Sequence, residues 1–151
     1  MSFYNLLYHV IFRTRYSIPA IDIARESELY KYMWGFIQNK GSKLYRIGGM
    51  PDHLHILMEV TVKIALADFI RDLKTSSAKW IKGNNLFPAF QGWASGYAAF
   101  TYAAKDKNMI VRYIMNQKEH HTKQNFEDEL QRLLIENGWK IGDEYPLKDD
   151  I

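Results

Sequence analysis

Residues 43–60, KLYRIGGMPDHLHILMEV, decide the fold, because they predict two β-strands joined by a turn. The strands are expected at 43–47 and 53–60, with glycine and proline in the turn between them. Side chains alternate across a strand, so His53 and His55 point to one face and the apolar residues around them to the other. Two adjacent imidazoles can share a metal ion, although such a pair alone is more often two satisfied or exposed histidines.

The periodicity of the remaining sequence places this hairpin inside an alternating series of elements. The order is α+β and ferredoxin-like: a βαββαβ unit, whose antiparallel sheet has helices on one face, followed by two C-terminal helices. The chain is expected to form a single domain over 1–151, with a flexible acidic tail at 140–151. Asn125 is the expected N-cap of the last helix, and Gly138 its end. The other strands are expected at 4–12 and 92–102, and the helices at 22–40, 64–82, 106–121 and 126–137.

The composition is that of a globular protein, with 47% hydrophobic and 25% charged residues in a chain of 151. No apolar run approaches the length of about 20 residues that spans a bilayer, and the N-terminus lacks the pattern of a signal peptide. We therefore expect a cytoplasmic protein without a membrane partner. The sequence contains no cysteine. Any metal would have to be held by histidine, carboxylate or amide oxygen.

The net charge of +3 conceals an asymmetry along the chain. Residues 1–126 contain 17 basic and 9 acidic residues, whereas residues 127–151 contain 3 basic and 8 acidic ones. A positive body indicates a polyanionic partner such as nucleic acid, although any single basic residue is more often a solvated surface charge. The candidate phosphate contacts are Arg13, Arg15, Lys74, Lys79, Lys82, Lys105 and Arg112.

Three polar residues follow one another at four-residue steps on the helix expected at 106–121. Tyr113, Gln117 and His121 therefore share one flank of it. The amide oxygen of Gln117 is a suitable ligand for Mg²⁺ or Mn²⁺, and Tyr113 could present its hydroxyl to the same place. The alternative is that the tyrosine ring packs in the core and the glutamine bonds to solvent.

Together these segments resemble a known family. His53-Leu54-His55-Ile56-Leu57 resembles the histidine–hydrophobic–histidine strand of the HUH nucleases, and residues 111–117 resemble the nucleophile helix of their single-tyrosine transposases. These are the small transposases of bacterial insertion sequences and their domesticated relatives associated with repetitive extragenic palindromes. The remaining matches to the family pattern are Phe12-Arg13-Thr14, Asp52, Leu73-Lys74, Ser76-Ser77, Trp93 and Gly96-Tyr97.

The resemblance implies that His53, His55 and Gln117 hold one divalent cation, Mg²⁺ or Mn²⁺, and that Tyr113 is the nucleophile. It implies cleavage and rejoining of single-stranded DNA through a 5′-phosphotyrosine, beside hairpins at element ends or in repetitive palindromes. It also implies a homodimer, in which the tyrosine helix of one subunit completes the metal site of the other. A positive site would help a phenol, whose ordinary pKa is about 10, to act as a nucleophile.

Two other functions remain open from the residues alone. The chain could be a non-catalytic module that binds a DNA or RNA hairpin, with Tyr113 only packing. It could also be a metal-dependent hydrolase that uses His53 and His55 with water as the nucleophile. No general base is assigned, although Lys118, His120 and His121 lie close to Tyr113 in sequence.

Overall fold

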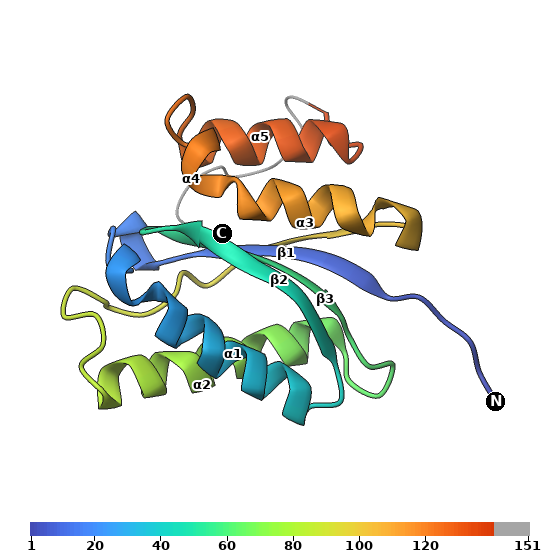
Figure 1. Cartoon of the computed structure of the whole chain (residues 1–151), viewed down its shortest axis with the longest axis horizontal. Helices are drawn as coiled ribbons and strands as arrows, with labels where there is room; N and C mark the ends of the chain where they lie inside the picture. Colours follow the sequence, from blue (N-terminus) through green and yellow to red (C-terminus); the bar gives the residue numbers. More distant parts are fainter. Residues whose placement is uncertain (141–151) are drawn as a thin grey trace.

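The computed structural model describes residues 1–140 and shows a twisted antiparallel sheet with helices on both faces (Figure 1). The acidic tail expected at 140–151 lies outside the described residues, apart from Lys140. The elements are β1 (Leu7–Arg13), η1 (Arg15–Ser17), η2 (Ile23–Arg25), α1 (Glu26–Asn39), β2 (Lys43–Met50), β3 (His53–Glu59), α2 (Leu66–Gly83), β4 (Ala98–Thr101), η3 (Ala104–Asp106), α3 (Lys107–Met115), α4 (Gln117–His120) and α5 (Phe126–Glu136).

The strand order is β2-β3-β1-β4, and each strand is antiparallel to its neighbours. The predicted hairpin is present, but β2 continues to Met50, so the turn is confined to Pro51 and Asp52. Gly49 allows this tight return, because a Cβ there would lie 2.2 Å from the His53 carbonyl oxygen. The turn consequently places His53 at the first position of β3.

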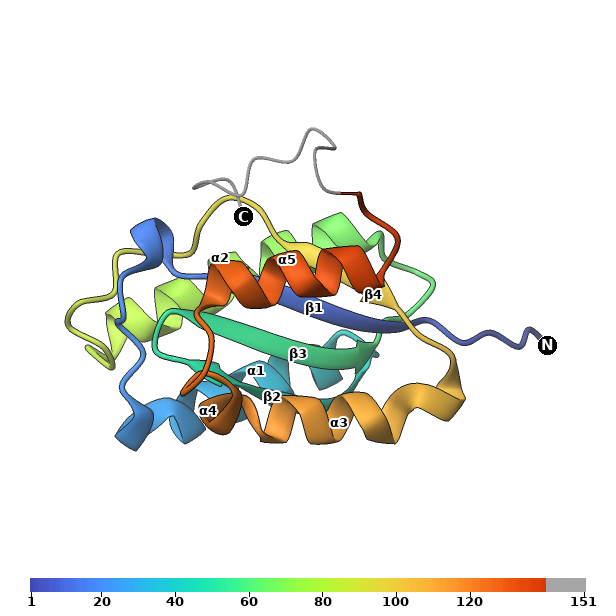
Figure 2. The same ribbon diagram turned by 90° about the horizontal axis from the view of Figure 1, so that it is seen from above.

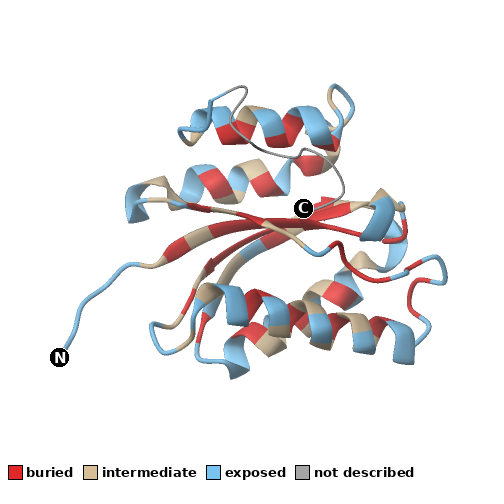
Figure 3. Ribbon diagram, turned by 180° about the vertical axis from the view of Figure 1, so that it is seen from behind, coloured by how far each residue is buried: buried red, intermediate tan, exposed pale blue. Residues whose placement is uncertain are grey.

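The helices divide between the two faces of the sheet. α1 and α2, the helices of the βαββαβ unit, lie side by side on one face, whereas α3, α4 and α5 lie over the other (Figures 1 and 2). The predicted α+β, ferredoxin-like class is therefore confirmed, and the C-terminal helices cover the face that the unit itself leaves open. The central strands β1 and β3 are buried between the two helical layers, whereas the edge strand β2 is partly exposed (Figure 3).

Apolar packing is concentrated beneath α1 and α2. One cluster there contains Val10, Phe12, Leu54 and Ile56 from the strands together with residues of both helices. The other face has two smaller clusters, one around Phe100 and α5 and one around Leu57 and α3. Buried polar side chains lie on this second face, where α5 and the start of α4 meet the sheet.

Several elements are shorter than predicted: the first strand begins at Leu7 rather than at residue 4, and the first helix at Glu26 rather than at residue 22. The fourth strand begins at Ala98 rather than at residue 92, and the carbonyl oxygens of Ala94 and Gly96, which precede it, accept hydrogen bonds from Lys74 Nζ at 2.9 and 2.6 Å. The helix predicted at 106–121 is divided at Asn116 into α3 and α4.

The last helix agrees with its predicted signals. The Asn125 side chain accepts from the backbone N–H of Asp128 at 2.9 Å, as expected of an N-cap. Gly138, at φ 96°, follows the end of the helix. None of the helices between residues 1 and 140 is long and apolar enough to cross a membrane.

Candidate active site

Both histidines of β3 face α3, α4 and α5, and both are fully buried. Leu54 and Ile56 point the other way, into the core beneath α1 and α2. The predicted alternation along β3 is confirmed. His9 of β1, also fully buried, joins them without having been predicted, since its Nε2 lies 2.8 Å from His55 Nδ1.

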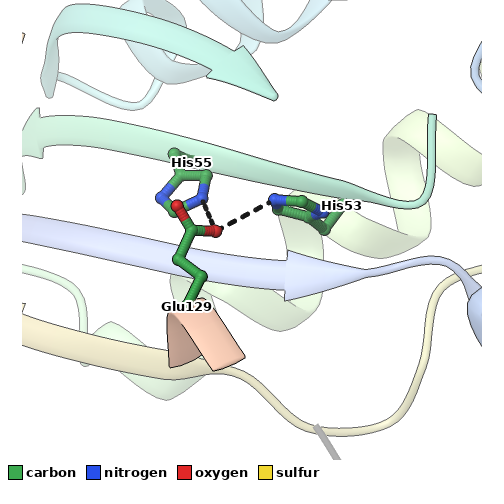
Figure 4. Close-up of side chains that lie close together, drawn as sticks. All are labelled: His53, His55 and Glu129. Carbon is green, nitrogen blue, oxygen red and sulfur yellow. Dashed lines mark hydrogen bonds and ion pairs between the residues drawn. The ribbon is translucent and has the colours of Figure 1, made fainter. Parts of the chain in front are cut away.

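Hydrogen bonds behind the two imidazoles set their orientation. Asp52 Oδ1 lies 2.7 Å from His53 Nδ1, and His9 Nε2 is the corresponding neighbour of His55 Nδ1. Each ring turns its Nε2 toward one space between β3 and α5 (Figure 4). A partner on the far nitrogen is the usual device that fixes the tautomer of a metal-binding histidine.

The predicted tyrosine and glutamine reach the same space. Gln117 is buried, and its Oε1 lies 3.3 Å from His53 Nε2. The ring of Tyr113 has its centroid 5.8 Å from that of His55. One chain therefore brings together all four residues predicted for the metal site and the nucleophile.

Contacts with β2 hold α3 and α4 in this position. Gly48 allows a close approach, because a Cβ there would lie only 2.9 Å from the backbone oxygen of Ile114. Lys118 of α4 donates to the Gly49 carbonyl oxygen at 2.8 Å and pairs with Glu26 Oε2 of α1 at 2.9 Å. The tyrosine helix is thus packed against the sheet of its own chain.

Glu129 of α5 lies at the centre of the site, although nothing in the sequence interpretation had singled it out. It is fully buried, and its Oε1 lies 3.0 Å from His55 Nε2 and 2.9 Å from His121 Nε2. Its Oε2 accepts from Gln117 Nε2 at 2.8 Å and from the Tyr113 hydroxyl. The carboxylate therefore touches both the metal-site candidates and the candidate nucleophile.

A sequence signal for Glu129 exists on α5. Phe126, Leu130, Leu133 and Leu134 form the apolar stripe that packs on the sheet. Glu129 stands inside this stripe, three residues after its first member, where a carboxylate has to be paired or ligated.

The buried charges divide the site into neutral and ionised groups. Burial alone would raise the pKa of Glu129, but hydrogen bonds from His121, His53 and His55 hold that pKa well below its ordinary value. Burial lowers the pKa of His55 to about 4, and burial with the nearby His55 lowers the pKa of His9. Neutral imidazole is the form of histidine that binds metal ions.

The pKa of His53 is shifted in the opposite direction from that of His55. Burial lowers its pKa, but Asp52 and Glu129 outweigh burial and raise the pKa of His53 above its usual value. A positively charged group between two carboxylates would be favoured there. A divalent cation is one such group, and its binding would require His53 to give up its Nε2 proton.

The residues present fit a divalent cation. His53, His55 and Glu129 offer ligand atoms that all lie within 4.8 Å of one another, and the Gln117 amide oxygen adjoins them. Within residues 1–140, the ion-pair partners of this buried carboxylate are histidines alone. Two imidazole nitrogens with carboxylate and amide oxygens make a donor set suited to metals such as Mn²⁺.

The predicted DNA contacts are scattered over the molecule. Arg15, Lys74 and Lys82 line one cavity of about 440 Å³ between α2 and residues 91–97, together with Trp93 and Tyr97. α2 lies on the face of the sheet opposite Tyr113 (Figure 1). Burial lowers the pKa of Lys74 to about 8. Of the other predicted contacts, Arg13 is buried, whereas Lys79, Lys105 and Arg112 are exposed.

Comparison with known proteins agrees with this arrangement. A family model described as transposase IS200 like matches residues 2–117, a range that contains the histidine strand and ends at Gln117. The ISDra2 transposase TnpA of Deinococcus radiodurans is 26% identical over 121 residues, covering 77% of this chain and 86% of that protein.

Two solved structures share the fold. The crystal structure of a candidate transposase from Deinococcus radiodurans R1 is 26% identical, with a TM-score of 0.60 over 77% of this chain and 93% of that one. A REP-associated tyrosine transposase bound to a REP hairpin is 13% identical, also with a TM-score of 0.60, over 100% of this chain and 99% of that one. The match to the family model covers most of the chain, and the chain therefore belongs to the family of IS200-like transposases.

Proposed function

We propose that the protein cleaves and rejoins single-stranded DNA beside hairpins, by attack of Tyr113 on a phosphodiester with the help of a divalent cation. The observation that carries this proposal is the meeting of the Tyr113 hydroxyl, the two β3 histidines and Gln117 in one buried space. We place this activity in the cytoplasm, as the composition predicts.

A divalent cation held by His53, His55 and Gln117, with Glu129 beside them, would polarise the phosphorus and neutralise the phosphate charge. Burial and the Glu129 carboxylate raise the pKa of Tyr113, so its phenol is protonated at neutral pH. Glu129 accepts the hydrogen bond of this hydroxyl and is correctly placed to receive its proton.

Attack by the tyrosine oxygen forms the O–P bond of a 5′-phosphotyrosine and releases a free 3′-hydroxyl. The phosphotyrosine ester conserves the energy of the broken bond. A second 3′-hydroxyl can then reverse the reaction and join new ends without ATP. This is the chemistry that transposition of a DNA segment requires.

The contacts of α3 and α4 favour a tyrosine that acts within its own chain. Gly48 and Lys118 fasten these helices to the local sheet, and Tyr113 reaches His55 without a partner subunit. A tyrosine acting in trans would require α3 to leave these contacts. The homodimer remains a prediction, and we propose that it is not needed to assemble the site.

A single-stranded hairpin is the proposed substrate. The structurally similar REP-associated transposase is bound to a REP hairpin, and the positive charge of residues 1–126 suits a phosphate backbone. The cavity that contains Arg15, Lys74 and Lys82 is also lined by the half-buried ring of Tyr97, and an aromatic ring among basic residues is typical of sites for unpaired bases.

The first test incubates the full chain with labelled hairpin DNA from its own genomic flanks and Mn²⁺, then looks for an SDS-stable complex. We expect a complex with the wild type, none with Tyr113→Phe or His55→Ala, and an unchanged yield with the exposed control Tyr4→Phe. Binding without a complex would favour the non-catalytic module. Cleavage that leaves no protein attached and survives Tyr113→Phe would favour the hydrolase.

A further inference from the structure

The oxygen of Tyr113 has a second partner, which is not one of the metal-site candidates. Arg132 Nη2 donates to this oxygen at 2.8 Å, and the guanidinium carbon lies 5.5 Å from the centre of the tyrosine ring. Arg132 follows Glu129 by three residues on α5, so one helix supplies both partners. The tyrosine oxygen therefore lies between a carboxylate that accepts its proton and a cation that donates to it.

A cavity of about 200 Å³ opens beside this pair. The side chain of Arg132 is 39% exposed, whereas that of Glu129 is fully buried. The tyrosine oxygen can thus be approached from the Arg132 side. The cavity is lined by His9, Tyr102, Met109, Ile110, Tyr113, Arg132, Leu133, Glu136 and Asn137.

His9 supplies an independent sign that this cavity receives a polar ligand. Its Nδ1 is buried and has no hydrogen-bond partner within residues 1–140. If His55 ligates a cation through Nε2, its Nδ1 carries the proton and donates to His9 Nε2. His9 then carries its own proton on Nδ1, which is a buried donor without an acceptor. Native structures rarely leave such a donor unpaired.

We propose that Arg132 is a catalytic residue that stabilises the charge on the tyrosine oxygen, and that the same guanidinium holds a DNA phosphate next to the scissile one in this cavity. The inference rests on the proposed function, because it takes Tyr113 as the nucleophile. A guanidinium suits both tasks, since it stays charged and presents several donors in one plane.

The step balances without a further reactant. The Tyr113 oxygen forms a bond to phosphorus, and the bond from phosphorus to the 3′-oxygen breaks. The hydroxyl proton passes to Glu129, which accepts the hydrogen bond of that hydroxyl, and the departing 3′-oxygen takes up a proton in its turn. The phosphate carries one negative charge before and after the step. Negative charge on the tyrosine oxygen is transient, and Arg132 contacts that oxygen directly.

Among residues 1–140, the contact of Arg132 that competes with this role is an exposed ion pair. Arg132 Nη1 pairs with Glu136 Oε1 at 3.0 Å, one turn along α5, and the Glu136 side chain is 54% exposed. Exposed pairs of this kind are weak. A phosphate oxygen entering the cavity can therefore replace Glu136 as the partner of Nη1, while Nη2 stays on Tyr113.

The test compares the single-turnover rate of the SDS-stable complex in wild type, Arg132→Met and Arg132→Lys, with Gln131→Met as an exposed neighbour on α5. Loss of one donor to a developing charge reduces such rates about 100- to 1,000-fold, and this is the loss we expect for Arg132→Met. Arg132→Lys should recover part of the rate, and Gln131→Met should keep the wild-type rate. Thermal melting and hairpin gel shifts should be unchanged in all of them.

Chemical rescue separates catalysis from structure. Added guanidinium, at millimolar concentrations that leave the wild type unaffected, should restore part of the rate to Arg132→Ala. Equal rates for wild type and Arg132→Met would overturn this inference alone, as would a rate loss matched by loss of melting temperature and without rescue. Failure of the wild type to form any complex would instead overturn the proposed function.

Discussion

The two faces of the sheet have opposite chemistry. Beneath α1 and α2, the strands present aliphatic and aromatic side chains to one large apolar cluster. Beneath α3, α4 and α5, smaller apolar clusters flank a group of buried polar residues. β3 takes part in both, because His53 and His55 face one side while Leu54 and Ile56 face the other.

Burial has different consequences on the two faces. Each Å² of apolar surface removed from water contributes about 25 cal/mol to stability. A buried polar group contributes little when paired, and costs about 1–3 kcal/mol when left unpaired. The comparison teaches that α1 and α2 contribute mainly to stability, whereas α5 combines its own apolar stripe with the buried carboxylate of Glu129, which contacts the metal-site candidates and Tyr113.

The largest expected effects come from two neighbouring residues of β3 that face opposite sides of the sheet. Leu54→Ala should lower the free energy of unfolding by about 2–5 kcal/mol, because it leaves a cavity in the main core. His55→Ala should lower it by less, since no apolar packing beneath α1 and α2 is lost, yet abolish the SDS-stable complex. Urea unfolding without metal measures the first quantity, and the hairpin assay the second. Equal destabilisation by both would mean that the polar face also holds the fold.

The sequence was sufficient for the parts of the site that depend on local spacing. The alternation of β3 follows from a period of two, and Tyr113 and Gln117 lie one turn apart along the chain. The relation between Tyr113 and Gln117 is kept even though the helix is divided at Asn116. The strand order and the two helices on one face likewise follow from the order of elements.

Contacts between distant elements could not be read in this way. Glu129 reaches β3 only because α5 packs back across the sheet, and a period within α5 cannot say which strand it meets. The hydrogen bonds from Lys74 of α2 to the carbonyl oxygens of Ala94 and Gly96, just before the shortened fourth strand, are likewise contacts between distant segments. The charge of the sequence identified basic residues but not their positions. In the structure these residues lie on both faces of the sheet.

Metal binding gives the second comparison between the faces. Mn²⁺ at 100 times its dissociation constant should stabilise the wild type by about 2.7 kcal/mol. Leu54→Ala should show the same gain from a lower starting point, whereas His53→Ala should lose it. Thermal melting at increasing Mn²⁺, with and without EDTA, measures this. A gain that survives His53→Ala would place the cation elsewhere.

Glu129→Gln extends this titration to α5. If the carboxylate takes part in binding the cation, the variant should need about 10- to 100-fold more Mn²⁺ for the same shift, the usual range for groups that support a metal site. Glu127→Gln, on the exposed side of the same helix, is the matched control and should bind as the wild type does. Tighter binding by Glu129→Gln would mean that the carboxylate competes with the cation.

The smallest expected effects come from two glycines, Gly48 of β2, which adjoins α3, and Gly35 of α1. Gly48→Ala should destabilise by about 1–3 kcal/mol, as overpacking does, because its Cβ would lie 2.9 Å from the Ile114 carbonyl oxygen of α3. Gly35→Ala, within α1 and with no neighbour inside 4 Å, should stabilise by about 0.4–1 kcal/mol through the loss of freedom in the unfolded chain.

The rates of the same two glycine variants test whether the position of Tyr113 depends on the contact between α3 and β2. Gly48→Ala displaces α3 from β2, so the rate of the SDS-stable complex should fall by more than the lost stability explains, because Tyr113 and Gln117 shift relative to His55. Gly35→Ala should leave that rate unchanged. If Gly48→Ala loses stability but keeps its full rate, catalysis does not depend on the packing of α3 against β2 of the same chain. A tyrosine supplied by a second subunit would then become the better account of the site.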